Sequence, residues 1–294
     1  MSIRPRRSAL YMPGSNARAL DKARTLAADA LILDLEDAVA PDAKSAARLQ
    51  VAAAVKAGGY GQREIVVRVN ALSSDWGRDD IAAVADCGAD AILIPKVSSP
   101  GDIMMAARQL AQAGAPEKTR LWAMIETPTA ILGIESIART ARDPASRLDV
   151  FVMGTNDLAK ETRARFVPGR GPFLAWLSMS IAAARANNIE ILDGVWNDIA
   201  DVAGFRAECE QGRDFGMDGK TLIHPSQLGV ANEIFAPSAG ELEWAHKILS
   251  AFDLPENAGR GAISLDGRMV ELLHADIARR TVALGRAIVA VTTA

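Results

Sequence analysis

The chain has 294 residues, 49% of them hydrophobic, and a formal net charge of −3, so it forms a large globular core without the positive field that draws in nucleic acid. It contains no run of the ~18 apolar residues needed to span a membrane and no apolar signal segment before the first expected strand. Its two cysteines, Cys87 and Cys209, match no zinc motif, and we expect buried, reduced thiols in a cytoplasmic protein.

Eight strand candidates recur along the chain, most of them short apolar runs, with a helical pattern after nearly every one. The expected strands lie at residues 8–12, 30–37, 64–70, 91–96, 121–126, 149–154, 189–194 and 220–225. Alternation of strands and helices predicts a parallel α/β architecture. Eight units within roughly 225 residues favour a closed (β/α)8 TIM barrel over an open sheet.

The pattern changes after Gly229, where no ninth barrel unit follows. The elements expected there are a helix from about Glu241 to Phe252, a flexible connector at 256–261, a short strand and tight turn at 262–268, and a helix from about Met269 onward. We therefore predict a catalytic barrel at residues 1–235 and a helical extension or lid at residues 236–294. This extension would close over its own barrel mouth or over that of a neighbour.

Two acids, Glu126 and Asp157, follow consecutive expected strands. Because a barrel of this kind carries its chemistry at the carboxyl ends of the strands, we expect both side chains at one mouth. Carboxylate oxygens without histidine or thiolate ligands favour Mg²⁺ or Mn²⁺ over zinc. The alternative is that both acids cap the helices that follow them.

Arg68 interrupts the apolar run of the third strand, where an unpaired charge is costly. It should therefore face the acids Asp34, Glu36 and Asp37 after the second strand, or an anionic substrate. Its guanidinium suits a carboxylate or a developing enolate oxygen. The alternative is a purely structural ion pair with Glu36 or Asp37.

The remaining candidates have two interpretations each. Tyr11 ends the first strand, and Arg18 and Lys22 share a face of the next helix, where they would bind phosphates or remain surface charges. His224 follows the eighth strand, where a core or loop histidine is favoured over a substrate contact. Asp266 is the first residue of an Asp-Gly pair, and taken by itself this pair indicates a tight turn. No Walker or dinucleotide fingerprint is present, so no nucleotide cofactor is expected.

Several short segments, in order along nearly the whole chain, together resemble the citrate lyase β-subunit-like proteins of the HpcH/HpaI aldolase superfamily. These segments are residues 7–14, 33–37, 68–70, 94–96, 125–126, 219–225 and 266–269. Residues 153–161, with the later Asp193-Gly194 pair, are most similar to the malyl-CoA lyase and (3S)-malyl-CoA thioesterase branch.

The resemblance implies a Mg²⁺-dependent enzyme for 3-hydroxyacyl-CoA thioesters, built as a barrel in homotrimers or hexamers with the extension packed on a neighbouring subunit. By motif position, Glu126 and Asp157 would hold Mg²⁺, with Mn²⁺ as a substitute. Asp266 would be the catalytic acid/base, delivered from the adjacent subunit. The substrate-binding residues that the resemblance implies are Tyr11, Arg18, Lys22, Arg68 and Glu126, with Arg68 at the reacting end. Some relatives have lysine at the position of Arg18.

The leading expectation is retro-Claisen cleavage of a malyl-CoA-type thioester to glyoxylate and acetyl-CoA or propionyl-CoA. The first alternative is a (3S)-malyl-CoA thioesterase that yields malate and CoA at the same site. Further alternatives are a citryl- or citramalyl-CoA lyase, or a citrate lyase β subunit docked to an acyl carrier protein. The Gly-Thr-Asn-Asp sequence at 154–157 departs from the Gly-Ala-x-Asp of those relatives, which argues against citryl substrates.

Overall fold

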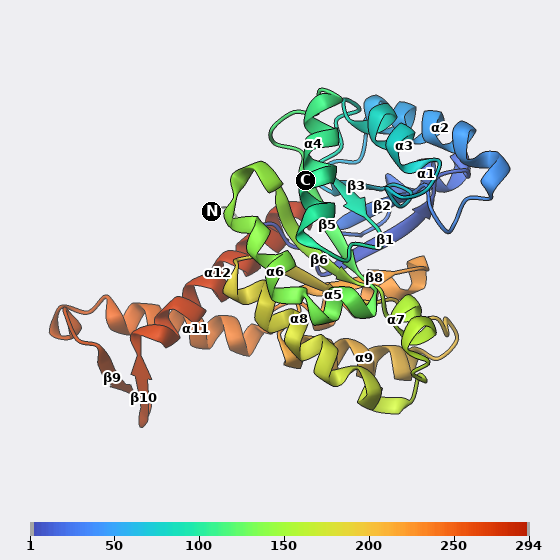
Figure 1. The fold of residues 1–294 in the computed structure, drawn as a ribbon. Coiled ribbons are helices and arrows are strands. Elements are labelled where there is room, and N and C mark those ends of the chain that lie inside the picture. The colour runs from blue at the N-terminus through green and yellow to red at the C-terminus, as the bar shows by residue number, and fades with distance from the viewer. Residues whose placement is uncertain (1–2, 293–294) are drawn as a thin grey trace. The chain divides into compact units, whose positions relative to one another are not determined.

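The computed structural model describes residues 3–292, which form two compact units. One unit contains residues 6–232, and the other combines the C-terminal residues from 233 onward with the N-terminal residues before 6. In the first unit, eight parallel strands close into a barrel in sequence order, and β1 pairs with both β2 and β8 (Figure 1). The strands are β1 (Ser8–Pro13), β2 (Ala30–Asp34), β3 (Glu64–Arg68), β4 (Ala91–Ile94), β5 (Arg120–Ile125), β6 (Leu148–Met153), β7 (Glu190–Asp193) and β8 (Gly219–Leu222). The predicted (β/α)8 barrel is therefore confirmed.

Helices follow the strands and cover the outside of the barrel (Figure 1). The α-helices up to the end of this unit are α1 (Ala17–Ala23), α2 (Lys44–Ala57), α3 (Gly77–Val84), α4 (Pro100–Gln112), α5 (Pro128–Leu132), α6 (Ile134–Arg139), α7 (Thr155–Thr162), α8 (Leu174–Ala186), α9 (Val202–Phe215) and α10 (Leu228–Ile234). The 3-10 helices are η1 (Pro41–Ala43), η2 (Thr140–Arg142), η3 (Pro144–Ser146), η4 (Pro168–Phe173) and η5 (Pro225–Gln227). Asn16 caps α1, because its side-chain oxygen accepts a hydrogen bond from Ala19 N–H. Both cysteines are buried free thiols, as predicted.

The strands position the site through their two-residue alternation. Along β3, Glu64, Val66 and Arg68 alternate and so point to the same face of the sheet. Val66 belongs to a buried apolar cluster that draws one or two residues from each of β1 to β7, including Trp122. Glu64 lies at the amino end of β3, and Arg68 lies at its carboxyl end. The apolar layer therefore separates a charged lower end from the functional upper end.

Arg6 fills the amino end of the barrel. Its guanidinium contacts Glu64 of β3 at 2.6 Å, Asp149 of β6 at 2.8 Å and Glu190 of β7 at 2.8 Å. It also lies 5.3 Å from the centre of the Trp122 ring. A buried guanidinium is tolerated here because several carboxylates surround it. This cluster joins strands that are distant in sequence, and it has a structural role.

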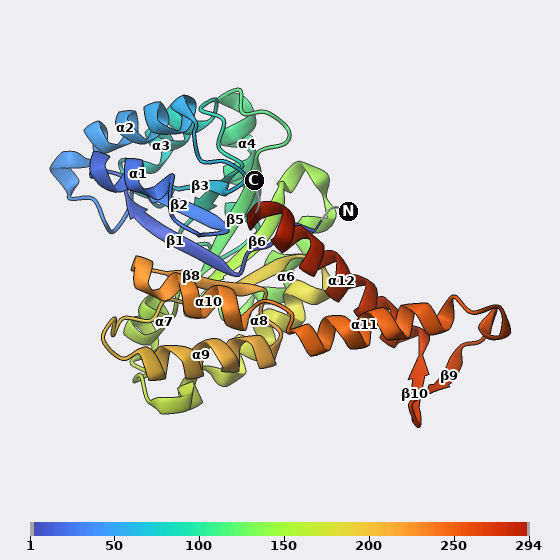
Figure 2. The same ribbon diagram turned by 180° about the vertical axis from the view of Figure 1, so that it is seen from behind.

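The C-terminal unit contains helices α11 (Ala239–Phe252) and α12 (Leu272–Thr292), the 3-10 helix η6 (Pro255–Asn257) and a hairpin of β9 (Ala262–Leu265) and β10 (Arg268–Glu271). Its small core forms between α11, α12 and the hairpin (Figure 2). The predicted C-terminal helix is present as α12, but it begins at Leu272 rather than at about Met269, because residues 268–271 pair antiparallel with β9. Within residues 3–292, no helix is both long and apolar enough to cross a membrane.

Candidate active site

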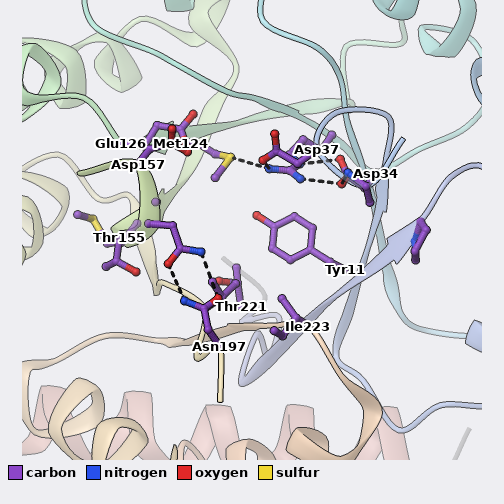
Figure 3. Close-up of a pocket in the computed structure, with 17 residues that line it drawn as sticks. Tyr11, Asp34, Asp37, Met124, Glu126, Thr155, Asp157, Asn197, Thr221 and Ile223 are labelled. Atoms are coloured by element: carbon purple, nitrogen blue, oxygen red, sulfur yellow. Dashed lines mark hydrogen bonds and ion pairs between the residues drawn. The ribbon is translucent and has the colours of Figure 1, made fainter. Parts of the chain in front are cut away.

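A cavity of about 350 Å³ lies at the carboxyl ends of the barrel strands. All the residues that line it belong to the barrel unit. Figure 3 shows Tyr11 projecting into this cavity, with Asp34 and Asp37 toward one side and Glu126 and Asp157 toward the other. The cavity therefore brings together Tyr11, Arg68, Glu126 and Asp157, four of the residues that the sequence predicts for the site.

Glu126 and Asp157 face a common cation, and in this structure the cation is the ammonium of Lys96. Lys96 Nζ lies 2.5 Å from Asp157 Oδ1 and 3.7 Å from Glu126 Oε1. The backbone N–H of Lys96 also donates to Glu126 Oε1 at 2.6 Å. Glu126 is 1% exposed, whereas the side chain of Asp157 is 24% exposed. One acid is thus fixed inside the barrel, and the other lies toward solvent.

The surroundings of these two acids fit a divalent cation better than they fit helix capping. Thr127, not Glu126, caps α5, by accepting from Ala130 N–H at 3.0 Å. Gly154 leaves room for the Glu126 carboxylate, because an added Cβ at Gly154 would lie 2.6 Å from Glu126 Oε2. Among the described residues, no three His, Cys, Asp or Glu side chains gather into one metal site. A Mg²⁺ ion here would therefore take its remaining ligands from water and substrate oxygens, as this ion commonly does.

Arg68 is held on the opposite side of the cavity by carboxylates from the end of β2. It contacts Asp34 at 2.6 Å, Glu36 at 2.7 Å and Asp37 at 3.4 Å. The alternative interpretation of the sequence was an ion pair of Arg68 with Glu36 or Asp37. The structure shows contacts with both, but the residue that accepts two hydrogen bonds from Arg68 is Asp34. The same Asp34 oxygens accept from the N–H groups of Glu36 and Ala38, which fixes the loop after β2. Arg68 is therefore a preorganised positive charge rather than a mobile one.

Tyr11 stacks on this charge. The guanidinium carbon of Arg68 lies 4.8 Å from the centre of the Tyr11 ring, within cation–π range. Burial raises the pKa of Tyr11, and the neighbouring Asp34 adds to this effect, while Arg68 opposes it. The phenol therefore remains protonated and is a hydrogen-bond donor for a ligand in the cavity.

Two of the carboxyl groups have unusual proton affinities. Burial raises the pKa of Glu126 to about 7, although Lys96 opposes the shift. Burial likewise raises the pKa of Glu36 to about 8, against the opposing charge of Arg68. Perturbed carboxyls in a cleft are typical of functional sites, because they hold or release a proton near neutral pH.

A second buried charge cluster supports the side of the cavity formed by β7 and β8. Asp193 binds Arg170 through Nη1 at 2.7 Å and Lys220 through Nζ at 3.3 Å, and Lys220 also contacts Glu208 at 2.7 Å. Burial opposes ionisation of Asp193, yet the two cations hold its pKa below the ordinary value. Because Arg170 lies in η4, this cluster anchors the loop after α7 to the barrel.

The other predicted residues lie outside the cavity lining. Arg18 and Lys22 are exposed on α1, which follows the cavity-lining end of β1. Asp266 is exposed in the C-terminal unit at the turn of the hairpin, where it pairs with Lys247. Its φ of 51° and the following Gly267 φ of 76° confirm the predicted turn. His224 is an exposed loop residue that caps η5, as the favoured interpretation predicts.

Sequence reasoning missed the positions of Lys96 and Gly154 in the site. Lys96 belongs to the Ile-Pro-Lys segment that contributes to the family resemblance. A charged residue directly after a buried strand could have marked it as a residue of the site. Glycine is needed at position 154 because a Cβ there would collide with the Glu126 side chain, and this approach is visible only in the closed barrel. The ion pairs of Arg170 and Glu208 join distant parts of the chain, and no sequence signal indicates them.

A family model described as HpcH/HpaI aldolase/citrate lyase matches residues 7–225. A (3S)-malyl-CoA thioesterase of Cereibacter sphaeroides is 50% identical over 286 residues, which cover 97% of this chain and 96% of that protein. Citrate lyase subunit beta of Escherichia coli is 34% identical over 273 residues, with coverage of 91% and 89%. The crystal structure of CitE from Mycobacterium tuberculosis in complex with magnesium, acetoacetate and coenzyme A is similar with a TM-score of 0.74 and 28% identity, covering 96% of this chain and 99% of that one.

The family match extends over Arg68, Glu126 and Asp157. The matches confirm the resemblance that the sequence segments indicate. The family match and the identities along nearly the whole length show that this chain belongs to the HpcH/HpaI aldolase/citrate lyase family.

Proposed function

We propose that this protein is a Mg²⁺-dependent enzyme for malyl-CoA-type 3-hydroxyacyl thioesters, with hydrolysis to malate and CoA as its net reaction. The observation that carries the proposal is the pair Glu126 and Asp157, which face one cation in a cavity that also contains Arg68. Hydrolysis is placed before carbon–carbon cleavage because relatives 49–50% identical over 97% of the chain are named (3S)-malyl-CoA thioesterase. This reverses the order of the two activities expected from the sequence.

Glu126 and Asp157 would hold the Mg²⁺ ion, for which Mn²⁺ would substitute. Both supply hard oxygen donors, and the small Gly154 gives Glu126 the space it needs. When bound, Mg²⁺ supplies Lewis-acid polarisation of substrate oxygens, worth several kcal/mol in catalysis of this kind. The magnesium in the structure of the Mycobacterium tuberculosis protein supports this assignment.

Arg68 and Tyr11 would orient the reacting end of the substrate. The guanidinium is fixed by Asp34, so its charge needs no reorganisation as negative charge develops on the acyl oxygen. The protonated Tyr11, which stacks on that guanidinium, would donate a hydrogen bond to a substrate oxygen in the same cavity. Arg18 and Lys22, exposed on α1 and one turn apart, would bind phosphate groups of the CoA moiety.

Asp266 would exchange the proton of the reaction from a neighbouring subunit of a homotrimer or homohexamer. Its carboxylate is exposed at the tip of a hairpin, paired with Lys247. The same C-terminal unit exposes Met269, Leu272, Leu273 and Ile277, a set of apolar side chains suited to burial against another protomer. A general acid/base on that surface would then complete the site only in the oligomer.

Retro-Claisen cleavage to acetyl-CoA and glyoxylate is the second candidate function. It is favoured by the position of Arg68, whose buried charge would stabilise the enolate oxygen of acetyl-CoA. The similarity to citrate lyase subunit beta also supports this candidate. Both reactions would use the same cation position and the same guanidinium.

The deciding experiment is product analysis with purified protein, malyl-CoA and Mg²⁺. Malate and free thiol in equal amounts mean hydrolysis, whereas glyoxylate and acetyl-CoA mean cleavage. Glu126→Gln should abolish either activity, which identifies the site responsible. Absence of both products in the presence of Mg²⁺ would contradict the proposal and favour a subunit that acts only with an acyl carrier protein.

A further inference from the structure

Lys96 has an unusual backbone conformation at the end of β4. Its φ is 57°, in the left-handed region that is unfavourable for a residue with a side chain. The conformation allows the Lys96 N–H to reach Glu126 Oε1 at 2.6 Å. Ser98 Oγ holds the loop by bonding the Lys96 carbonyl at 3.2 Å and the Thr127 hydroxyl at 2.9 Å. Strain of this kind persists where the surroundings enforce it, and it often marks a functional position.

The side chain of Lys96 bridges the two acids of the cation site. Its Nζ contacts Asp157 at 2.5 Å and lies 3.7 Å from Glu126. Two carboxylates near one point repel each other unless a positive charge lies between them. The Lys96 side chain is 34% exposed, whereas the Glu126 side chain is 2% exposed. The ammonium therefore has a path to solvent, and the carboxylate does not.

We propose that Lys96 is a built-in counter-ion that holds Glu126 and Asp157 in position until a divalent cation displaces its ammonium. The inference rests on the proposed Mg²⁺ site and adds a competitor for that site within the same chain. Lysine is suited to this role because its ammonium is a compact charge on a flexible stem. The competition lowers the apparent affinity for the cation and holds the two carboxylates near each other in its absence.

The test measures Mn²⁺ binding to metal-free protein by electron paramagnetic resonance and calorimetry. Lys96→Met keeps the length of the side chain but removes the charge, so it should bind Mn²⁺ at least ~10-fold more tightly, the scale expected for loss of a charge-assisted hydrogen bond. Lys160→Met removes the same charge from an exposed position on α7, and it should change the affinity by less than ~2-fold. Metal-free Lys96→Met should also melt at a lower temperature than wild type, with a smaller difference once Mn²⁺ is saturating.

Mn²⁺ binding to Lys96→Met that is equal to, or weaker than, binding to Lys160→Met would overturn the inference. If wild type binds no Mn²⁺, or if Glu126→Gln binds it as wild type does, the proposed metal site itself fails and the inference fails with it. Crystal structures of wild type with and without Mn²⁺ give a second test that needs no variant. The ammonium should leave Asp157 only in the Mn²⁺-bound structure, and continued contact there would equally overturn the inference.

Discussion

Arg68 donates to both carboxylate oxygens of Asp34, from Nε at 2.7 Å and from Nη2 at 2.6 Å. Both residues are buried, and they come from the carboxyl ends of adjacent strands. This pair fixes a positive charge at the wall of the cavity before any substrate arrives. In the proposed function, Asp34 would act on the reaction through the guanidinium that it positions.

Asp34→Asn should destabilise the protein and reduce its activity. Removing the Asp34 charge leaves the buried guanidinium with only Glu36 and Asp37 as acidic partners, so the cost in unfolding free energy should be at most about 3–5 kcal/mol, the cost of a fully broken buried pair. Turnover should fall by roughly 10²-fold, because the guanidinium loses its fixed orientation. Urea denaturation and steady-state kinetics measure the two effects. As a control, Asp79→Asn removes an exposed partner of Arg48 and should change stability by less than about 1 kcal/mol. Wild-type activity in Asp34→Asn would contradict the positioning role.

Gly154→Ala should weaken cation binding by displacing Glu126. The added methyl would lie 2.4 Å from Glu126 Cβ, so the carboxylate must move out of position. We expect at least ~10-fold weaker Mn²⁺ binding and a loss of about 1–3 kcal/mol in unfolding free energy from overpacking. Gly229→Ala is the matched control, since its added Cβ meets nothing within 4 Å. Mn²⁺ binding by Gly154→Ala as tight as that of wild type would place the cation elsewhere.

The metal-free protein should lose stability as the pH rises from about 4.5 to about 8. The folded protein binds a proton on Glu126 up to a pKa of about 7 and on Glu36 up to about 8, whereas both ordinarily release it near 4.5. Within that window the folded state holds more protons than the unfolded state. The contribution to stability is therefore complete at low pH and lost as the pH rises, by at most about 1.4 kcal/mol per pH unit and group.

Thermal unfolding in a chelating buffer at several pH values measures this trend. Glu126→Gln should remove the share of the slope that Glu126 contributes below about pH 7, because glutamine does not titrate, and should leave the share of Glu36. The affinity for Mn²⁺ should show the opposite dependence and fall below about pH 7, since a proton on Glu126 competes with the cation. A metal-free protein whose stability increases steadily from pH 5 to pH 8 would refute the prediction.

Mixed oligomers test whether Asp266 acts across a subunit boundary. Asp266→Asn should retain its fold and its affinity for Mn²⁺, because asparagine also tolerates a positive φ, while turnover falls by ~10²-fold or more. Arg68→Ala should be inactive for a separate reason. Mixing the two inactive chains should restore part of the activity, since one site then combines an intact Arg68 with an intact Asp266. No recovery in verified mixed oligomers would argue that Asp266 acts within its own chain or not at all.

The barrel could be predicted from sequence because its signal is local and repeated. Most of its strands contain an apolar run such as Leu121–Ile125, and most are followed by a turn and a helix. The second strand of the C-terminal hairpin carries no such signal. Residues 268–271 continue directly into α12, and their strand conformation depends on pairing with β9 across the turn. Only the tertiary contact decides between strand and helix there.

The cation site was partly predictable for a similar reason. Acids that follow adjacent strands, such as Glu126 and Asp157, must lie near one another in a parallel barrel. The partner of Arg68 could not be chosen among three acids by spacing alone, because the choice depends on the register of β2 and β3, which sets Asp34 beside Arg68. Lys96 was not predicted because its position requires a left-handed backbone that nothing in the Ile-Pro-Lys segment demands.

Arg6 is made early in translation, but its acceptors at positions 64, 149 and 190 follow much later. A nascent chain that ends before residue 190 therefore carries this guanidinium without its full set of counter-charges. Half-barrel fragments should be poor folding units for that reason, because none of them contains Arg6 together with all three acceptors. An N-terminal truncation that removes Arg6 would likewise leave three carboxylates facing one another beneath the core.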